Sequence, residues 1–287
     1  MNVILVCIDN FQEYILINIR NLIRLKHKNI FIITNEKFFS FFSEFDSSQI
    51  VLVRSESIED SYNYKPGINV DSKFRNGFWG LTSKRFFYIY SFMKQRNVSN
   101  VFHIENDVLT YYNCDVLEKT INNDKIWVPA DSLRRSIASI IYIPNYEIFG
   151  LFLNNYNNRA NDMQNLSYSQ SIMPHLFDNF PICFKSEFHT PEQKFVTRTY
   201  DLFNMIFDAA AIGQYLGGID PRNNPSSSNT VGFINETSVI KYDSYDFVWR
   251  KSLDDDTRKP FIKLDDNTYI PIFNLHIHSK NLSHFVS

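Results

Sequence analysis

The apolar residues at the start of the chain follow two different spacings. Residues 3–8 form a mostly apolar run with β-branched members, which is typical of a buried strand. Apolar residues then recur at helical spacing over 11–25, and a second apolar run covers 29–34. A strand, a helix and a strand in close succession predict a βαβ unit of the kind found in nucleotide-binding sheets, with parallel strands.

The next part of the chain continues this alternation. Residues 38–45 have the spacing of a helix and residues 50–54 that of a strand, whereas the polar stretch 56–77 reads as a loop near a ligand site. Thr82 or Ser83 can cap a helix that runs to about Gln95. Residues 98–104 then form another apolar strand.

The second half of the chain is less regular but still mixes strands and helices. We expect strands at 125–130, 136–143 and 269–277, helices at 146–156, 162–166 and 208–216, and a surface loop at 222–229. No repeat of fixed period and no clean domain boundary is visible. The pattern predicts one α/β domain over 1–287, with a Rossmann-like, mostly parallel central sheet flanked by helices.

Composition narrows the class of protein. Hydrophobic residues make up 44% of the 287 positions, which is enough for a substantial core. The net charge of −2 gives no basic excess of the kind that binds nucleic acid or anionic membranes. The first apolar run is too short for a signal peptide or a transmembrane segment, and the three scattered cysteines show no disulfide or zinc spacing, so we expect a cytoplasmic protein.

The stretch VFHIENDVL contains the most informative polar residues. It places Glu105 and Asp107 directly after the apolar strand, and side chains two apart in extended backbone point to the same side. Two carboxylates so close repel each other unless a positive charge lies between them, and Mg²⁺ or Mn²⁺ is held by such oxygens. The alternative is that both acids are solvated loop residues at a strand end.

The order of elements and this motif resemble the GT-A glycosyltransferases, in which a βαβ half precedes a helix and a hydrophobic strand that ends in an acid-x-acid motif. The usual motif is Asp-x-Asp, and this chain has Glu105-Asn106-Asp107. The resemblance implies that Asp107 binds the Mn²⁺ or Mg²⁺ ion that bridges a nucleotide-sugar diphosphate. Glu105 would contact the metal or the nucleotide sugar, and Asn106 the nucleotide sugar.

The segment FNLHIHSKNL strengthens the resemblance, because members of the family bring a late histidine to the metal and a nearby lysine to the phosphates. His276 and His278 share a strand face, and either imidazole can complete an oxygen-rich Mn²⁺ site. Lys280 would contact a phosphate oxygen. Each of the three can instead be an ordinary buried or surface residue.

The resemblance implies further nucleotide-sugar contacts. Arg85, near the start of the helix before the motif, would face the diphosphate, and Asp9 and Asn35 would contact the nucleoside, usually uridine. Asp208 is the expected catalytic base of an inverting reaction, although an aspartate there can equally cap a helix. Asp162 and Asp220 are the other candidates for the base.

We therefore expect a metal-dependent hexosyl- or pentosyltransferase that moves a sugar from a nucleotide sugar, expected to be a UDP-sugar, to a glycan or glycoconjugate acceptor. Residues 1–110 would form the nucleotide-binding half, and residues 111–287 the acceptor-binding half with the C-terminal metal and phosphate segment. A metal-dependent nucleotidyltransferase and a non-catalytic sugar-binding module of the same fold are the alternatives. A glycosidase is disfavoured, since acids side by side on one strand cannot flank a glycosidic bond.

Overall fold

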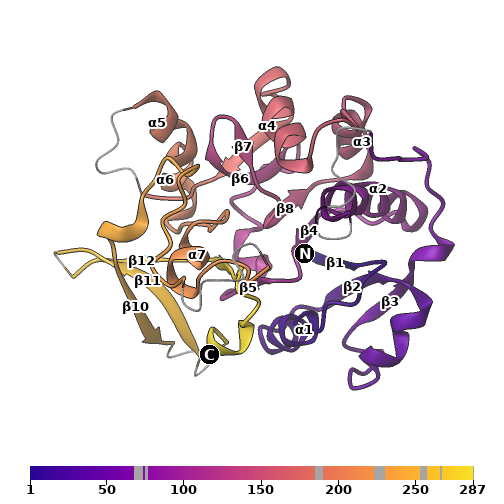
Figure 1. Ribbon diagram of the computed structural model, residues 1–287, viewed down its shortest axis with the longest axis horizontal. Helices are drawn as coiled ribbons and strands as arrows, with labels where there is room; N and C mark the ends of the chain where they lie inside the picture. Colours follow the sequence, from indigo (N-terminus) through magenta and orange to yellow (C-terminus); the bar gives the residue numbers. More distant parts are fainter. Residues whose placement is uncertain are drawn as a thin grey trace.

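The computed structural model of the protein describes residues 1–67, 74, 77–184, 190–222, 230–252, 257–265 and 267–286. Apart from Arg222, the surface loop expected at 222–229 lies outside these residues. The chain forms a large central sheet, a smaller three-stranded sheet and a two-stranded ribbon, with helices packed around them (Figure 1).

The central sheet has the strand order β3-β2-β1-β4-β8-β6-β7, with β9 also paired to β6. Its strands are β1 (Asn2–Cys7), β2 (Asn29–Thr34), β3 (Val51–Arg54), β4 (Val101–Ile104), β6 (Ile126–Ser132), β7 (Arg135–Ser136), β8 (Ile140–Ile143) and β9 (Phe177–Phe180).

The strand directions confirm the predicted mostly parallel sheet. The neighbours β3, β2, β1 and β4 pair parallel to one another. Strand β8 is antiparallel to both β4 and β6, so that β6 and its parallel partner β9 run in the same direction as the first four strands. The carboxyl ends of β1, β2 and β4 therefore meet at one edge, which is where open α/β sheets bind ligands.

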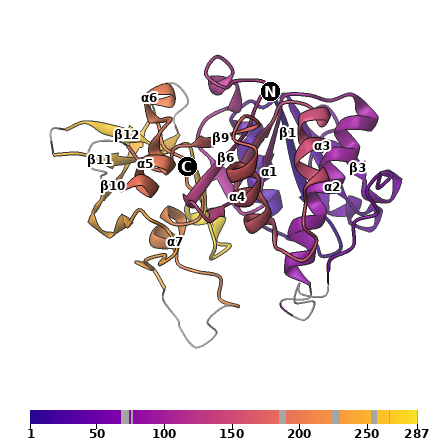
Figure 2. The same ribbon diagram turned by 90° about the horizontal axis from the view of Figure 1, so that it is seen from above.

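Helices cover both faces of this sheet, as predicted. The helices are α1 (Ile15–Arg24), α2 (Phe78–Arg96), α3 (Tyr146–Asn154), α4 (Asp162–Ile172), α5 (Pro191–Thr197), α6 (Tyr200–Phe203) and α7 (Ile212–Gly217), with 3₁₀ turns at η1 (Glu36–Phe42), η2 (Ser55–Ser57), η4 (Cys114–Leu117), η5 (Tyr242–Ser244) and η6 (Leu282–His284). Alternate residues of β1 face opposite sides: Val3 and Leu5 share one buried cluster with α1, whereas Ile4 belongs to another with α2 and α3. Figure 2 shows α1 and α2 on opposite sides of β1.

Two smaller sheets complete the second half of the chain. Strands β10 (Asp246–Lys251), β11 (Arg258–Lys263) and β12 (Tyr269–Pro271) form an antiparallel sheet, and β5 (Val108–Thr110) pairs antiparallel with β13 (Asn274–His276). The single strand expected at 269–277 is therefore wrong. The chain leaves the three-stranded sheet after Pro271, which has no N–H to continue a ladder, and joins β5 three residues later.

The start of α2 also differs from the prediction. The helix begins at Phe78, directly after Gly77, whose φ of 82° only glycine adopts readily. Thr82 lies inside the helix and its hydroxyl donates to the Trp79 carbonyl, so neither Thr82 nor Ser83 is the N-cap. The prediction placed the start of the helix too late, because the mostly apolar residues 78–81 already belong to its first turn.

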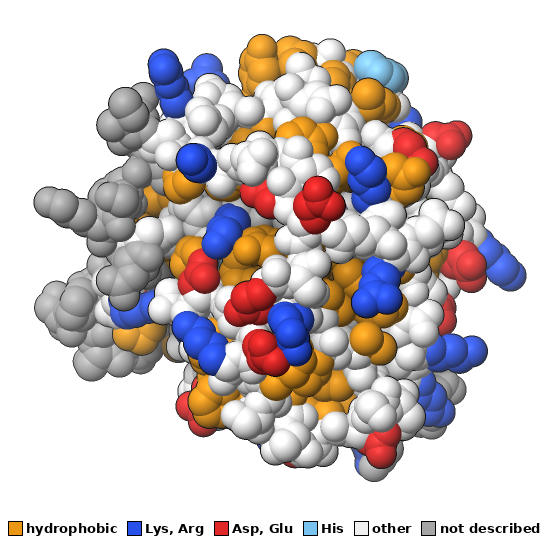
Figure 3. Space-filling view, turned by 90° about the vertical axis from the view of Figure 1, so that its right-hand side faces the viewer, with side chains coloured by type: hydrophobic (Ala, Val, Ile, Leu, Met, Phe, Trp, Pro, Cys, Tyr) orange, Lys and Arg blue, Asp and Glu red, His pale blue; other side chains and the backbone are white. Residues whose placement is uncertain are grey.

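The surface carries mixed charge on the side of α2 and β3. Figure 3 shows cationic, acidic and apolar side chains interspersed there, without one sign gathering into a continuous patch. Among the described residues, no helix is long and apolar enough to span a membrane.

Close packing of α7 against β13 gives the first testable prediction. A Cβ at Gly213 would lie 2.1 Å from the carbonyl oxygen of His276, a contact that only a backbone shift can relieve. We expect Gly213→Ala to lower the free energy of unfolding by about 3 kcal/mol, measured by urea denaturation. The matched control is Gly217→Ala on the same helix, where a Cβ would meet the Phe285 ring at 3.0 Å and the ring can move. Equal losses in the two variants would contradict this account.

Candidate metal and nucleotide site

A cavity of about 770 Å³ opens at the carboxyl ends of β1 and β4. Its wall is built from the segment after β1, the start of α2, the β4–β5 turn, α4, the loop after α7 and the segment after β13. Acidic, basic and imidazole groups lie in it together, and those that bear on the function are Arg85, Glu105, Asp107, Asp162, Asp220, His276, His278 and Lys280.

The turn between β4 and β5 places the two motif acids. Its backbone is held at both ends, since the Glu105 N–H donates to the Ser139 carbonyl and the Val108 N–H donates to the Glu105 carbonyl. The Asn18 side chain of α1 donates to the carbonyls of both Glu105 and Asn106 at 3.3 Å. Asn18, a buried residue of α1, therefore fixes the turn, a role that the sequence did not predict.

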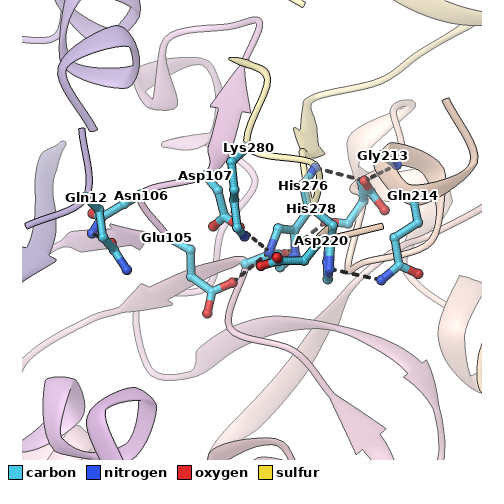
Figure 4. Close-up of polar contacts among 12 residues, drawn as sticks. Gln12, Glu105, Asn106, Asp107, Gly213, Gln214, Asp220, His276, His278 and Lys280 are labelled. Atoms are coloured by element: carbon cyan, nitrogen blue, oxygen red, sulfur yellow. Dashed lines mark hydrogen bonds and ion pairs between the residues drawn. The ribbon is translucent and has the colours of Figure 1, made fainter. Parts of the chain in front are cut away.

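Asn106 points away from the two acids. Its amide donates to the Val6 carbonyl at 2.7 Å and to the Gln12 side chain. Figure 4 shows Asn106 turned toward Gln12 while Glu105 and Asp107 point the other way. The side chain lines the cavity, but its donors tie the motif to the end of β1.

Three ligand atoms converge at this place. Oxygens of Glu105 and Asp107 and a ring nitrogen of His276 all lie within 4.8 Å of one another. The Nε2 atom of His276 is 3.1 Å from Glu105 Oε2 and 3.4 Å from Asp107 Oδ2. Carboxylate oxygens are the ligands that Mn²⁺ and Mg²⁺ share, and an imidazole can complete an oxygen-rich Mn²⁺ site, so these residues fit the predicted ion, Mn²⁺ better than Mg²⁺.

The orientation of His276 suits a metal ligand. Its Nδ1 atom lies 2.8 Å from the Ala209 carbonyl, which can only accept, so Nδ1 carries hydrogen. The Nε2 atom therefore faces the carboxylates with its lone pair whenever the ring is neutral. Burial lowers the pKa of His276, but Asp107 and Glu105 together raise it to about 9. In the absence of a cation, a proton on Nε2 thus partly balances the two acids.

Asp107 is also paired with Lys280, whose ammonium group contacts Oδ2. Burial would raise the pKa of Asp107, yet the charges of Lys280 and His276 hold it well below its ordinary value. Lys280 has a φ of 63°, uncommon for a residue with a Cβ, and its N–H donates to the Ile277 carbonyl. The tight turn after β13 therefore directs Lys280 back toward the acid motif.

Arg85 holds the other acid. Its guanidinium forms ion pairs with Glu105 Oε1 and, at 2.7 Å, with Asp162 Oδ2. Burial lowers the pKa of Arg85, and Glu105 and Asp162 outweigh that effect and raise it. Because Arg85 occupies Oε1, Glu105 turns Oε2 toward His276. Arg85, which was predicted to contact the diphosphate, thus lines the cavity, and in this structure it orients Glu105.

The contacts of Asp208 agree with the helix-capping alternative to a catalytic base, because its side chain accepts from the first N–H groups of α7. Asp208 is buried, and its Oδ1 accepts the N–H of Ile212 at 2.9 Å. Its Oδ2 accepts the N–H groups of Gly213 at 2.7 Å and His276 at 2.9 Å. Asp208 is not among the described residues that line the cavity. These contacts favour a structural role over the predicted role as a base.

Asp9 and Asn35 lie together beside the cavity. The Asn35 side chain accepts the N–H of Asp9 at 2.6 Å and donates to Glu56, while the Asp9 carboxylate forms an ion pair with Lys84 at 3.2 Å. Neither side chain lines the cavity as described, although the neighbouring Ile8 and Asn10 do. Asp9 and Asn35, the predicted nucleoside contacts, thus lie close together, but beside the cavity and not in its described wall.

Two further residues in the cavity wall had a small part or none in the sequence analysis, which gave Asp220 only as another candidate for the base and did not predict Gln214. Asp220 is buried, and Arg222 two residues later pairs with it at 2.8 Å. Gln214 contacts Nδ1 of His278 at 3.0 Å, and Figure 4 shows the two side chains facing each other. The glutamine follows a glycine on a short helix, and no motif marks it.

Removal of one acid tests the metal site. We expect Asp107→Asn to weaken Mn²⁺ binding by about a hundredfold, because a carboxylate ligand is lost from a site with few donors. Mn²⁺ titration followed by electron paramagnetic resonance measures this. The control Asp124→Asn changes an exposed acid and should bind Mn²⁺ as the wild type does. Unchanged Mn²⁺ affinity in Asp107→Asn would show that the ion is not held here.

A second substitution tests the role of Asp208. Asparagine at this position must turn an NH₂ group toward backbone N–H groups, so we expect Asp208→Asn to destabilise the fold by about 3 kcal/mol in urea denaturation. The same exposed control, Asp124→Asn, should change stability by less than about 0.5 kcal/mol. A variant of wild-type stability that has lost only its turnover would favour the catalytic base after all.

Comparison with known proteins gives similarities to solved structures alone. No protein-family model and no curated protein matches the sequence. The apo form of mouse xyloside xylosyltransferase 1 is similar at a TM-score of 0.42 and 8% identity, over 63% of this chain and 84% of that one.

Two further solved structures show the same range of similarity. The galactosyltransferase LgtC, in complex with donor and acceptor sugar analogues, has a TM-score of 0.40 and 12% identity over 63% of this chain and 75% of that one. A cytidylyltransferase from Leptospira borgpetersenii has 0.40 and 10% over the same shares. At such TM-scores these similarities assign no activity to this chain.

Proposed function

We propose that this chain is a cytoplasmic, GT-A-like, metal-dependent glycosyltransferase. It would transfer a hexosyl or pentosyl group from a nucleotide sugar, expected to be a UDP-sugar, to a glycan or glycoconjugate acceptor. The observation that carries the proposal is the convergence of Glu105, Asp107 and His276 within 4.8 Å, with Lys280 on the same acid, in a cavity at the carboxyl edge of a mostly parallel sheet.

The proposed chemistry needs positive charge at the leaving diphosphate. Mn²⁺ or Mg²⁺ held by Glu105, Asp107 and His276 would supply Lewis-acid stabilisation of that charge. Lys280 is placed to exchange its partner: its ammonium contacts Asp107 here and would bind a phosphate oxygen once a cation neutralises the acid. Arg85 would keep Glu105 oriented through its ion pair with that carboxylate.

The cavity is large enough for such a donor. Its volume of about 770 Å³ lies within the range of small-molecule and cofactor sites. We propose that residues 1–110 bind the nucleotide and that residues 111–287 bind the acceptor. Residues from both ranges line the cavity, which is compatible with this division. The start of α2 adds Phe78 and Trp79, whose rings lie 5.0 Å apart, as an apolar surface in that wall.

We propose Asp220 as the general base of an inverting transfer, in place of Asp208. Five acids line the described cavity. Glu105 and Asp107 belong to the metal site, Asp162 is paired with Arg85, and Glu13 is exposed to solvent, which leaves Asp220. Asp220 is buried, and the Arg222 side chain that pairs with it is 60% exposed. Arg222 can therefore move into solvent and leave the carboxylate to an acceptor hydroxyl.

Turnover of nucleotide sugars tests the proposal. We expect the purified protein with Mn²⁺ to release UDP from at least one radiolabelled UDP-sugar, by hydrolysis or by transfer to simple sugars. Asp220→Asn should lower this rate about a hundredfold while the affinity for UDP, measured by calorimetry, stays within about twofold. Asp124→Asn is again the control.

Three results would contradict parts of this proposal. Release of pyrophosphate from a nucleoside triphosphate and a sugar phosphate would indicate the nucleotidyltransferase. Sugar binding without turnover would indicate the non-catalytic module. Full activity in Asp220→Asn would remove that residue from the mechanism and leave the transferase in place.

A further inference from the structure

The two neighbouring histidines after β13 differ in their hydrogen bonds. The rings of His276 and His278 are 4.1 Å apart between centroids. The Nδ1 atom of His276 donates to the Ala209 carbonyl, so that in the neutral ring Nε2 has a lone pair toward the acids. The Nδ1 atom of His278 instead faces the side-chain amide of Gln214 at 3.0 Å.

A chain of hydrogen bonds settles the direction of that contact. It starts at a backbone N–H, that of Thr237, which can only donate and lies 3.0 Å from Asn235 Oδ1. The Asn235 Nδ2 group is therefore directed at Gln214 Oε1, 2.9 Å away. This contact leaves Gln214 Nε2 to donate to His278 Nδ1. Since Nδ1 accepts, the neutral His278 ring carries its hydrogen on Nε2.

That Nε2–H group is buried and has no hydrogen-bond partner among the described residues. Buried donors are almost always paired in proteins, so a lone one in a cavity wall indicates a missing acceptor. The acceptor is best an anionic oxygen, since Lys280 and Arg135 line this cavity and both act electrostatically on His278. An Nε2–H group cannot bind a cation, and so His276 alone of the two histidines has the tautomer of a metal ligand.

We propose that His278 donates its Nε2–H to a phosphate oxygen of the nucleoside diphosphate, and that Gln214 and Asn235 are positioning residues that fix its tautomer. This inference rests on the proposed function for the identity of the ligand. It assigns one histidine of the His-x-His pair to the ion and the other to the anion, where the sequence left open which of the two binds the metal.

The first experiment reads the tautomer without any ligand. Long-range ¹H–¹⁵N correlation spectra of histidine-labelled protein should show His278 with a protonated Nε2 and a bare Nδ1. Asn235→Asp should reverse this, because a carboxylate at 235 accepts from the Gln214 amide and turns the Gln214 oxygen toward His278. Hydrogen on Nδ1 of His278 in the wild type would overturn the proposal.

The second experiment measures binding of UDP, and separately of inorganic pyrophosphate, to Mn²⁺-loaded protein by calorimetry. We expect Asn235→Asp and His278→Ala each to weaken both ligands by tenfold to a hundredfold, about the effect of one hydrogen bond to a charged group. Mn²⁺ affinity should change less than about threefold, because His276 is untouched. His278→Gln, which restores an NH₂ donor near the Nε2 position, should recover much of the loss.

Controls separate this inference from the proposed function. Asn123→Asp adds the same charge on an exposed loop, and its oxygen can still accept the Tyr142 hydroxyl, so it should bind as the wild type does. Wild-type affinity in His278→Ala, or loss of Mn²⁺ binding in it, would overturn the role of His278. If the wild-type protein binds pyrophosphate but not UDP, the proposed donor is contradicted. The role of His278 can then still be tested by the binding of pyrophosphate to its variants. Binding of neither would overturn both.

Discussion

The arrangement of the site depends on one buried residue, Asp208. Its carboxylate joins the first N–H groups of α7 to the N–H of His276, and its own carbonyl accepts from the side chains of Ser139 and Asn274. The next carbonyl along the chain, that of Ala209, then accepts from the His276 ring. Two consecutive residues thus fix both the backbone and the imidazole of the histidine that faces the acid motif.

The second constraint is the balance of charge. Glu105 and Asp107 are brought close in a place with little solvent, which is costly unless positive groups share it. Arg85, Lys280 and the His276 imidazolium supply that charge in the protein alone. The acids are consequently held in place without an ion, and Lys280 is the one of these groups that a metal and a diphosphate would displace.

The sequence predicted the framework better than the details of the site. The period of the apolar residues gives β1, α1 and β2 because each packs by a local repeat, and the same-side placement of Glu105 and Asp107 follows from local backbone geometry. The tautomers of the two histidines could not be predicted, since they depend on Ala209 and Asn235, far away in the chain. For Asp208, the residue types alone do not distinguish a carboxylate that binds backbone N–H groups from one that removes a proton.

The pairing of β5 with β13 determines when the site can form during synthesis of the chain. Asp107 and Lys280 are 173 positions apart, and the strand that carries His276 pairs with the strand that follows the acids. On the ribosome, the two acids therefore emerge long before their imidazole and ammonium partners. A nascent chain cannot hold this centre together, so the site described here would form only when synthesis has passed Lys280.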